Sequence, residues 1–165
     1  MKMVTNIRTG LGFDSHRLVE GRELIIGGAK IPFEKGLMGH SDAVVLIHAI
    51  IDALFGACAL GDIGSHFSDK DPAYKDIDSM LLLKKTAEII KQNGYTVGNI
   101  DATVIIERPK LAPYITKMRE NIPNVLETNI DRISVKAKTT EGMGDVGNGN
   151  AAEAMCIALV YGEEK

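Results

Sequence analysis

The chain has 165 residues and a formal net charge of −3, with 45% hydrophobic and 25% charged residues. This balance is typical of a compact globular protein, and at this length we expect residues 1–165 to form a single domain. The negative charge and the absence of tryptophan argue against nucleic-acid binding, because no basic stripe with interleaved aromatic residues is present. Every apolar run that reaches membrane-spanning length contains a charged residue or a histidine. The sequence also shows no signal or transit peptide. We therefore expect a cytoplasmic protein with no membrane contact.

The first half of the chain has the pattern of strands around one apolar helix. An N-terminal strand is expected to end near His16, and residues 24–32, with two central glycines, have the pattern of a hairpin. Residues 42–60 are apolar almost all round, which predicts a helix that is buried on most of its surface and stopped by Gly61.

The second half begins with a long polar segment. Residues 61–78 are too long for an ordinary connection, which predicts a functional loop or lid. We then expect a helix at residues 79–93, a strand at 99–107, a helix that begins near Ala112, and a strand at 132–138. Residues 152–161 fit a helix or a strand equally well on periodicity alone.

Three histidines and an aspartate in the first third of the chain have the character of metal ligands. Asp14 and His16 are two residues apart, so their side chains share one face of an extended strand. His48, in the apolar helix, is the best third ligand, and two imidazoles with one carboxylate suit Zn²⁺. Three protein ligands leave one coordination position open, which is typical of a catalytic zinc site.

Asp52 lies four residues after His48, on the same helix face. We expect its carboxylate to accept a hydrogen bond from the distal nitrogen of His48, as carboxylates beside zinc ligands do. The alternative is that His48 and Asp52 are a polar pair that satisfies itself inside an apolar helix, with no metal.

Five longer motifs carry a resemblance to a known family. They are, in chain order, GLGFDSHRL, IPFEKGLMGHSDA, LGDIGSHFSDKDPAYKDIDS, NIDATVIIERPKLAPYI and VKAKTTEGMG. Together, from about Ile7 to about Val160, they resemble the 2-C-methyl-D-erythritol 2,4-cyclodiphosphate synthase family. The resemblance implies an α+β domain with a mixed four-stranded β-sheet, helices packed on one face, and assembly as a homotrimer. It also implies that residues 152–161 form a strand.

The same resemblance implies a reaction. The family converts 4-diphosphocytidyl-2-C-methyl-D-erythritol 2-phosphate into the 2,4-cyclodiphosphate and releases CMP, a lyase step of non-mevalonate isoprenoid precursor synthesis. The 2-phosphate attacks the β-phosphorus within the same molecule. By resemblance, Asp14, His16 and His48 hold one Zn²⁺ per chain and contact the substrate, and Glu141 helps to hold Mg²⁺ or Mn²⁺ between the substrate phosphates.

Further residues match the substrate site of the family. His40 and Ser41 correspond to a pair near the substrate phosphate, and Ser41 also fits the N-cap of the following helix. Asp62, with Ile63 and Gly64, corresponds to the group that binds the methylerythritol unit. The nucleotide and its phosphates are expected to contact a set from the neighbouring subunit: Lys110, Ala137, Thr139 and Thr140. The residues interpreted as catalytic are His40, Ser41, Asp62, Thr139, Thr140 and Glu141.

The chain departs from the family pattern at several positions. Val44 replaces an aspartate that would complete a capping box with Ser41, and Lys138 replaces a threonine before the TTE motif. In relatives a phenylalanine, an arginine and a glutamate after Gly144 line a cavity on the trimer axis that takes isoprenoid diphosphates. The loss of that arginine argues against binding of such a ligand here. The residues at these positions are Asp145, Asn148 and Asn150.

Two other functions fit the same residues. A zinc-dependent phosphodiesterase would use a zinc-bound hydroxide, with Asp62 or Glu141 as its base. A noncatalytic trimeric ligand-binding paralogue is suggested by the altered run at residues 144–151. The complete set of metal ligands favours the cyclising enzyme over the noncatalytic paralogue.

Overall fold

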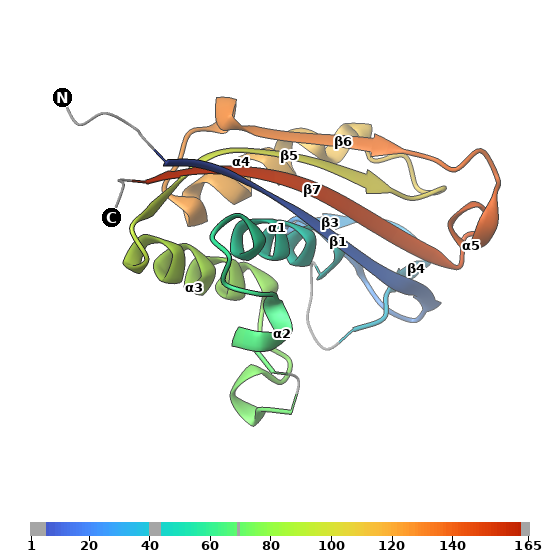
Figure 1. Ribbon diagram of the computed structural model, residues 1–165. Helices are drawn as coiled ribbons and strands as arrows, with labels where there is room; N and C mark the ends of the chain where they lie inside the picture. The colour runs from blue at the N-terminus through green and yellow to red at the C-terminus, as the bar shows by residue number, and fades with distance from the viewer. Residues whose placement is uncertain (1–5, 40–43, 69, 163–165) are drawn as a thin grey trace.

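The protein is built on a mixed β-sheet with helices packed on one side (Figure 1). The structure, a computed structural model, describes residues 6–39, 44–68 and 70–162. The five-stranded sheet has the order β4-β1-β7-β5-β6, in which β5 and β6 are parallel and the other neighbours are antiparallel. Its strands are β1 (Asn6–Glu20), β4 (Lys35–Leu37), β5 (Tyr95–Ile105), β6 (Ile133–Lys138) and β7 (Ala151–Gly162).

The expectation of a mixed sheet is confirmed, but the expected number of four strands is wrong. β1 continues past His16 to Glu20, and its last residues pair with β4. β4 is only 3 residues long, which is too short for an alternating pattern to reveal it in the sequence. The predicted hairpin is present as β2 (Leu24–Ile26) and β3 (Ala29–Ile31), which form a separate two-stranded sheet.

β7 resolves the ambiguity of residues 152–161 in favour of a strand. It lies between β1 and β5 in the middle of the sheet. Its buried positions carry the small side chains of Ala152, Ala154, Cys156 and Ala158, which alternate with more exposed residues. Small residues pack in helices and strands alike, so the sequence pattern alone could not distinguish the two.

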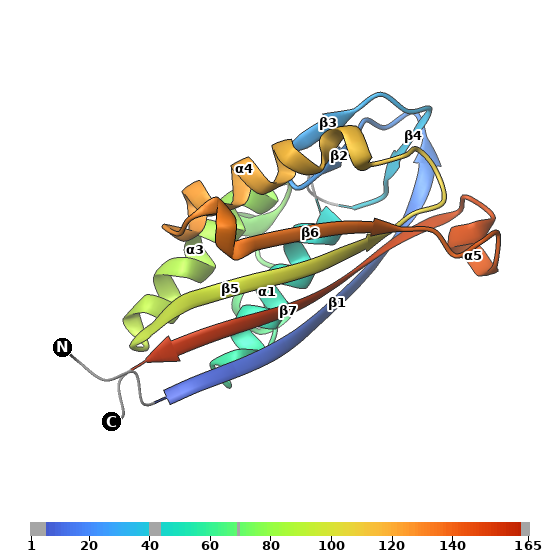
Figure 2. The ribbon, with the colours of Figure 1, turned by 90° about the horizontal axis from the view of Figure 1, so that it is seen from above.

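The helices lie in a layer against the sheet (Figure 2). Its long members are α1 (Val44–Ala57), α3 (Ser79–Gln92) and α4 (Ile115–Leu126). The helix expected from Ala112 is confirmed, although its start is the 3₁₀ turn η2 (Ala112–Tyr114). Two further short elements are η3 (Ile130–Arg132) and α5 (Gly144–Gly147). In the described part of the chain, no helix is both long and apolar enough to cross a membrane.

α1 packs directly against β1, and two glycines allow the close approach. A Cβ atom at Gly10 would lie 2.0 Å from the carbonyl oxygen of Ala53, and one at Gly12 would lie 1.8 Å from that of Ala49. The apolar side chains of α1 are buried, as its composition predicts. The helix ends at Ala57, before the expected residue 60, and Ala59 then turns the chain with a left-handed φ of 57°.

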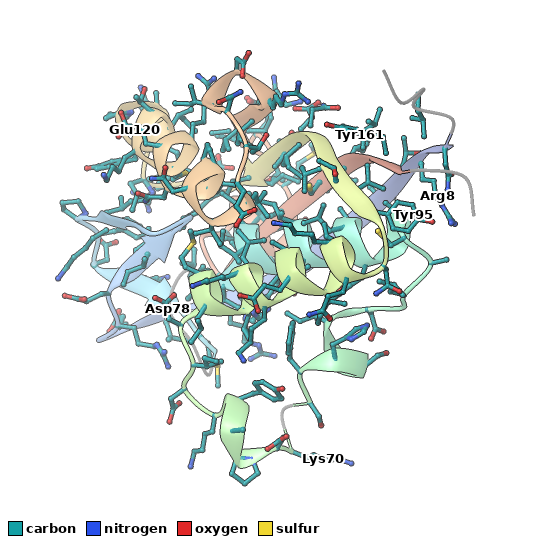
Figure 3. The ribbon with its side chains drawn as sticks, turned by 90° about the vertical axis from the view of Figure 1, so that its left-hand side faces the viewer. Arg8, Lys70, Asp78, Tyr95, Glu120 and Tyr161 are labelled. Atoms are coloured by element: carbon teal, nitrogen blue, oxygen red, sulfur yellow. The ribbon has the colours of Figure 1, made fainter. Side chains whose placement is uncertain are left out.

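The segment 61–78 projects from the body of the protein (Figures 1 and 3). Its described part contains α2 (Ile63–His66) and the turn η1 (Pro72–Tyr74), and Figure 3 labels Lys70 at its outer end. At its base the ring of His66 stacks on Phe55 of α1, with centroids 4.1 Å apart, and Phe67 contacts Tyr74. The segment is therefore a folded projection, and its role as a lid stays a prediction.

The face of the sheet opposite the helices, called the outer face below, carries exposed apolar side chains. The exposed fraction is 62% for Leu11, 51% for Phe13 and 54% for Ile157. In the register of the sheet Leu11 lies beside Ile157 and Phe13 beside Met155, so these side chains are neighbours across the two strands. A continuous exposed apolar patch is typical of a surface that contacts another protein chain.

We expect Gly10→Ala to destabilise the fold by about 3 kcal/mol, the upper end of the usual cost of overpacking, because the added methyl group meets backbone atoms of α1. Gly56→Ala is the matched control. A Cβ there has no neighbour closer than 3.9 Å, and alanine favours the helix by roughly 0.5–1 kcal/mol over glycine. Urea unfolding at equal protein concentrations measures both variants. An unchanged midpoint for Gly10→Ala would contradict the close packing of α1 on β1.

Candidate active site

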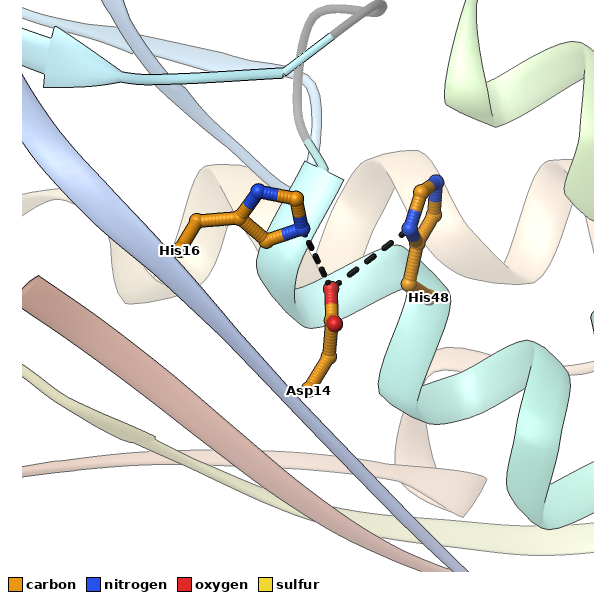
Figure 4. A group of neighbouring side chains, drawn as sticks. All are labelled: Asp14, His16 and His48. Atoms are coloured by element: carbon orange, nitrogen blue, oxygen red, sulfur yellow. Dashed lines mark hydrogen bonds and ion pairs between the residues drawn. The ribbon is translucent and has the colours of Figure 1, made fainter. Parts of the chain in front are cut away.

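The structure brings Asp14, His16 and His48 together, as the sequence predicts (Figure 4). Asp14 and His16 project from β1 toward α1, which carries His48. His16 Nε2 lies 2.9 Å from Asp14 Oδ2, and His48 Nδ1 lies 3.5 Å from the same oxygen. One ligand atom of each residue lies within 4.8 Å of the others, so the three form a group that can hold a metal ion.

His16 is held between two hydrogen-bond acceptors. Its Nδ1 lies 2.7 Å from the carbonyl oxygen of Met38, and its Nε2 faces the Asp14 carboxylate. A carbonyl oxygen only accepts, so Nδ1 carries a proton. Nε2 must then be the second N–H of an imidazolium ion or direct its lone pair at a cation shared with Asp14. Burial lowers the pKa of His16, but the hydrogen bond and the charge of Asp14 outweigh it and raise the pKa overall.

Asp14 is the common partner of both histidines. Burial raises the pKa of its carboxyl group, but the hydrogen bonds with His16 and His48 and the charges of the two rings outweigh burial and lower the pKa. The carboxyl group is therefore ionised at neutral pH. One carboxylate oxygen and two imidazole nitrogens are a donor set that suits a divalent transition metal, so the residues present fit such an ion.

The expected hydrogen bond between Asp52 and His48 is wrong. Asp52 Oδ1 accepts a hydrogen bond of 2.7 Å from the backbone N–H of Ile63, at the start of α2. The distal nitrogen of His48, Nε2, lies 3.5 Å from the hydroxyl oxygen of Ser79, the first residue of α3. The turn after α1 brings an otherwise unpaired N–H group to Asp52, and this tertiary contact has no signal in the sequence.

A cavity of about 280 Å³ opens beside the metal-ligand group. Ile63 and Gly64 line it, and their role in substrate binding stays a prediction. Sequence reasoning did not identify the apolar part of its wall, which comes from the projecting segment and α3: Phe67, Tyr74, Ile77 and Leu82. These residues were missed because an isolated aromatic or aliphatic residue in a polar loop is equally consistent with a structural anchor.

Asp62 lies at the N-terminus of α2 and acts as its cap. Its Oδ1 accepts hydrogen bonds from the backbone N–H of Ser65 at 2.8 Å and from the Ser65 hydroxyl at 2.6 Å. These hydrogen bonds lower the pKa of the exposed Asp62 carboxyl group. The residue therefore satisfies a structural role, and a role in substrate binding stays a prediction.

The expected nucleotide residues gather at a different edge of the protein, where β5 and β6 end. Thr139 Oγ1 donates to Glu141 Oε1 at 2.9 Å, and Thr140 Oγ1 donates to the carbonyl oxygen of Met143 at 2.7 Å. Lys110 follows β5, and Ala137 lies on β6. All of these residues except the half-buried Thr140 are exposed, so the cluster is open to a ligand.

Within one chain this cluster does not join the metal-ligand group. One row of the sheet runs from Asp14 through Ala154 and Val104 to Ala137. Neighbouring strands lie about 4.8 Å apart, so Asp14 and Ala137 are roughly 14 Å apart. Among the described residues, the group within reach of one metal ion contains Asp14, His16 and His48, and Glu141 lies outside it. His40 and Ser41 lie outside the described residues.

The sequence matches the YgbB family over residues 7–161. The chain belongs to this family. The 2-C-methyl-D-erythritol 2,4-cyclodiphosphate synthase of Chloroherpeton thalassium is 58% identical over 93% of this chain and 98% of its own length. The bifunctional IspDF of Campylobacter jejuni matches the structure with a TM-score of 0.91 and 37% identity, over 96% of this chain and 43% of that chain. IspF of Plasmodium falciparum, solved as a CDP complex, matches with a TM-score of 0.83 and 31% identity, over 96% of this chain and 98% of that chain.

We expect this YgbB family member to bind about one divalent metal ion per chain at the Asp14, His16 and His48 group. His48→Ala should lose the ion, because two ligands hold a divalent metal much more weakly than three. His66→Ala is the matched control, since it removes a histidine that hydrogen-bonds to Leu60 outside the group. Elemental analysis after dialysis measures the metal content per chain of each variant. Full metal content in His48→Ala would exclude this residue as a ligand.

Proposed function

We propose that this protein is a 2-C-methyl-D-erythritol 2,4-cyclodiphosphate synthase of non-mevalonate isoprenoid precursor synthesis. Its substrate would be 4-diphosphocytidyl-2-C-methyl-D-erythritol 2-phosphate, and its products the cyclic diphosphate and CMP. One observation carries the proposal: in a chain of this family, Asp14, His16 and His48 form a compact metal-ligand group at the edge of a cavity. A noncatalytic paralogue would have no need to keep that group.

The metal-ligand group and the exposed Glu141 suit two different kinds of metal ion. Imidazole nitrogens favour Zn²⁺ over harder cations, so we assign zinc to Asp14, His16 and His48. Glu141 offers carboxylate oxygens at an exposed position, which suits Mg²⁺ or Mn²⁺ shared with phosphate oxygens. When bound, such ions neutralise phosphate charge and polarise the phosphorus that is attacked.

The protein residues then bind, orient and shield the substrate. Asp62, Ile63 and Gly64 would hold the methylerythritol unit, and the apolar wall of the cavity would exclude water from the reacting phosphates. His40 and Ser41 would contact the phosphate next to the metal. The groups assigned to cytidine and its phosphates are Lys110, Ala137, Thr139 and Thr140. With both ends held, the 2-phosphate attacks the β-phosphorus, and the bond from that phosphorus to the oxygen of CMP breaks.

We assign a homotrimer as the working form, with each active site between two subunits. Two observations support this assignment. The outer face exposes a continuous apolar patch over β1 and β7. In addition, the metal-ligand group and the nucleotide cluster lie roughly three strand spacings apart within a chain, so a neighbouring chain is needed to complete a compact site.

A complementation experiment tests the shared site. We expect His48→Ala and Glu141→Gln each to lose most activity, whereas trimers formed by co-expressing both variants should regain about a quarter of the wild-type activity, because random assembly leaves that share of interfaces intact. His48→Ala co-expressed with Asp14→Ala is the matched control, since both changes damage the same half of the site. Absence of recovery in the first mixture would place both halves in one chain.

The origin of the attacking oxygen distinguishes the synthase from a zinc-dependent phosphodiesterase. In the synthase the nucleophile is the tethered 2-phosphate, so no oxygen from water enters the products. A phosphodiesterase would deliver hydroxide from water. We expect incubation with substrate, Mg²⁺ and ¹⁸O-labelled water to yield unlabelled CMP and an unlabelled cyclic diphosphate, as mass spectrometry would detect. Label in either phosphate, with no cyclic product, would overturn the proposed function.

A further inference from the structure

Glu107 holds the loop that carries Glu141. It lies just after β5, and each of its carboxylate oxygens accepts one backbone hydrogen bond from the loop after β6. Oε2 accepts from the N–H of Thr140 and Oε1 from the N–H of Gly142, both at 3.2 Å. The two donors are the residues on either side of Glu141, so one carboxylate brackets the proposed ligand of the second metal ion.

The bracketed turn has a backbone shape that needs support. Glu141 has a φ of 54° and Gly142 a φ of 77°, two successive residues in the left-handed region. For a residue with a side chain this backbone conformation is unfavourable in free energy. Glu141 therefore keeps it only if contacts with its surroundings stabilise it. Three sets of hydrogen bonds support the turn. They are the two N–H bonds to Glu107, the contacts of the Thr139 hydroxyl with the side chain and N–H of Glu141, and the two bonds between Thr140 and Met143.

Glu107 also links the two loops of the nucleotide cluster. It is three residues before Lys110 in the loop after β5, and the loop after β6 carries Thr139 and Thr140. The backbone bond from Ile106 N–H to the carbonyl oxygen of Lys138, 2.9 Å long, lies beside this link. Both oxygens of the half-buried Glu107 are used by backbone donors, so it acts on the site through the loop rather than by contact with substrate.

We propose that Glu107 is a positioning residue, which fixes the Glu141 turn and thereby sets the affinity for the Mg²⁺ or Mn²⁺ ion of the reaction. The inference rests on the proposed role of Glu141. It follows from the paired carboxylate bonds on both sides of a left-handed residue, a geometry that a fixed ligand requires and a freely moving surface glutamate does not.

The test compares Glu107→Gln with Glu107→Ala in the Mg²⁺ dependence of steady-state turnover. Glutamine keeps one oxygen acceptor and alanine keeps none, so the effect should be graded. We expect the Mg²⁺ concentration for half-maximal activity to rise about tenfold in Glu107→Gln and further in Glu107→Ala, the range seen when a residue that orients a metal ligand is lost. Zinc content and melting temperature should stay near wild type in Glu107→Gln.

Two reference variants make every outcome informative. Glu120→Gln removes the same charge on the surface of α4, away from the loop, and should leave the Mg²⁺ requirement unchanged. Glu141→Gln should raise that requirement at least as much as Glu107→Ala. A shift in Glu141→Gln without one in either Glu107 variant would overturn the positioning role alone. No shift in Glu141→Gln would overturn the assignment of Glu141 as a ligand, and with it the inference about Glu107.

Discussion

The close contact between α1 and β1 is the constraint on which the rest of the site depends. Gly10 and Gly12 leave no side chain between the strand and the helix, so the backbone of α1 lies almost on the sheet. His48 on the helix is thereby brought within 3.5 Å of Asp14 on the strand. A larger spacing would leave the strand with two ligands and the helix with an isolated histidine, and the geometry of a three-ligand metal site would be lost.

Electrostatics within this contact make the group suitable for a cation. Asp14 presents one oxygen to two imidazole rings, and the Met38 carbonyl orients His16 from the other side. Without a positive charge near His16 Nε2, two lone pairs would face each other, which is unfavourable in a half-buried position. The raised pKa of His16 and the lowered pKa of Asp14 have the same cause, which is the attraction between a positive charge at the imidazole and the carboxylate.

The sequence predicted the parts of the fold and site that depend on local patterns. The spacing of Asp14 and His16, the apolar character of α1 and the glycine-marked hairpin were sufficient for the metal-ligand group and most elements. The number of strands was wrong because β4 is 3 residues long and pairs with a part of β1 that has no local signal. The partner of Asp52 was wrong because Ile63 meets it only after the chain reverses direction. The bracketing role of Glu107 likewise depends on a parallel pair of strands, whose neighbours in space are far apart in sequence.

β1 has metal-ligand side chains on one face and exposed apolar side chains on the other. Asp14 and His16 point toward α1, whereas Leu11 and Phe13 point away to the outer face. Because side chains alternate along a strand, inserting or deleting one residue between Phe13 and Asp14 would place both sets on the same face of the sheet. Either the metal ligands would then join the apolar residues on the outer face, or the apolar residues would turn toward α1, so one of the two faces would lose its side chains. The spacing of the two sets along β1 is therefore as constrained as the residues themselves.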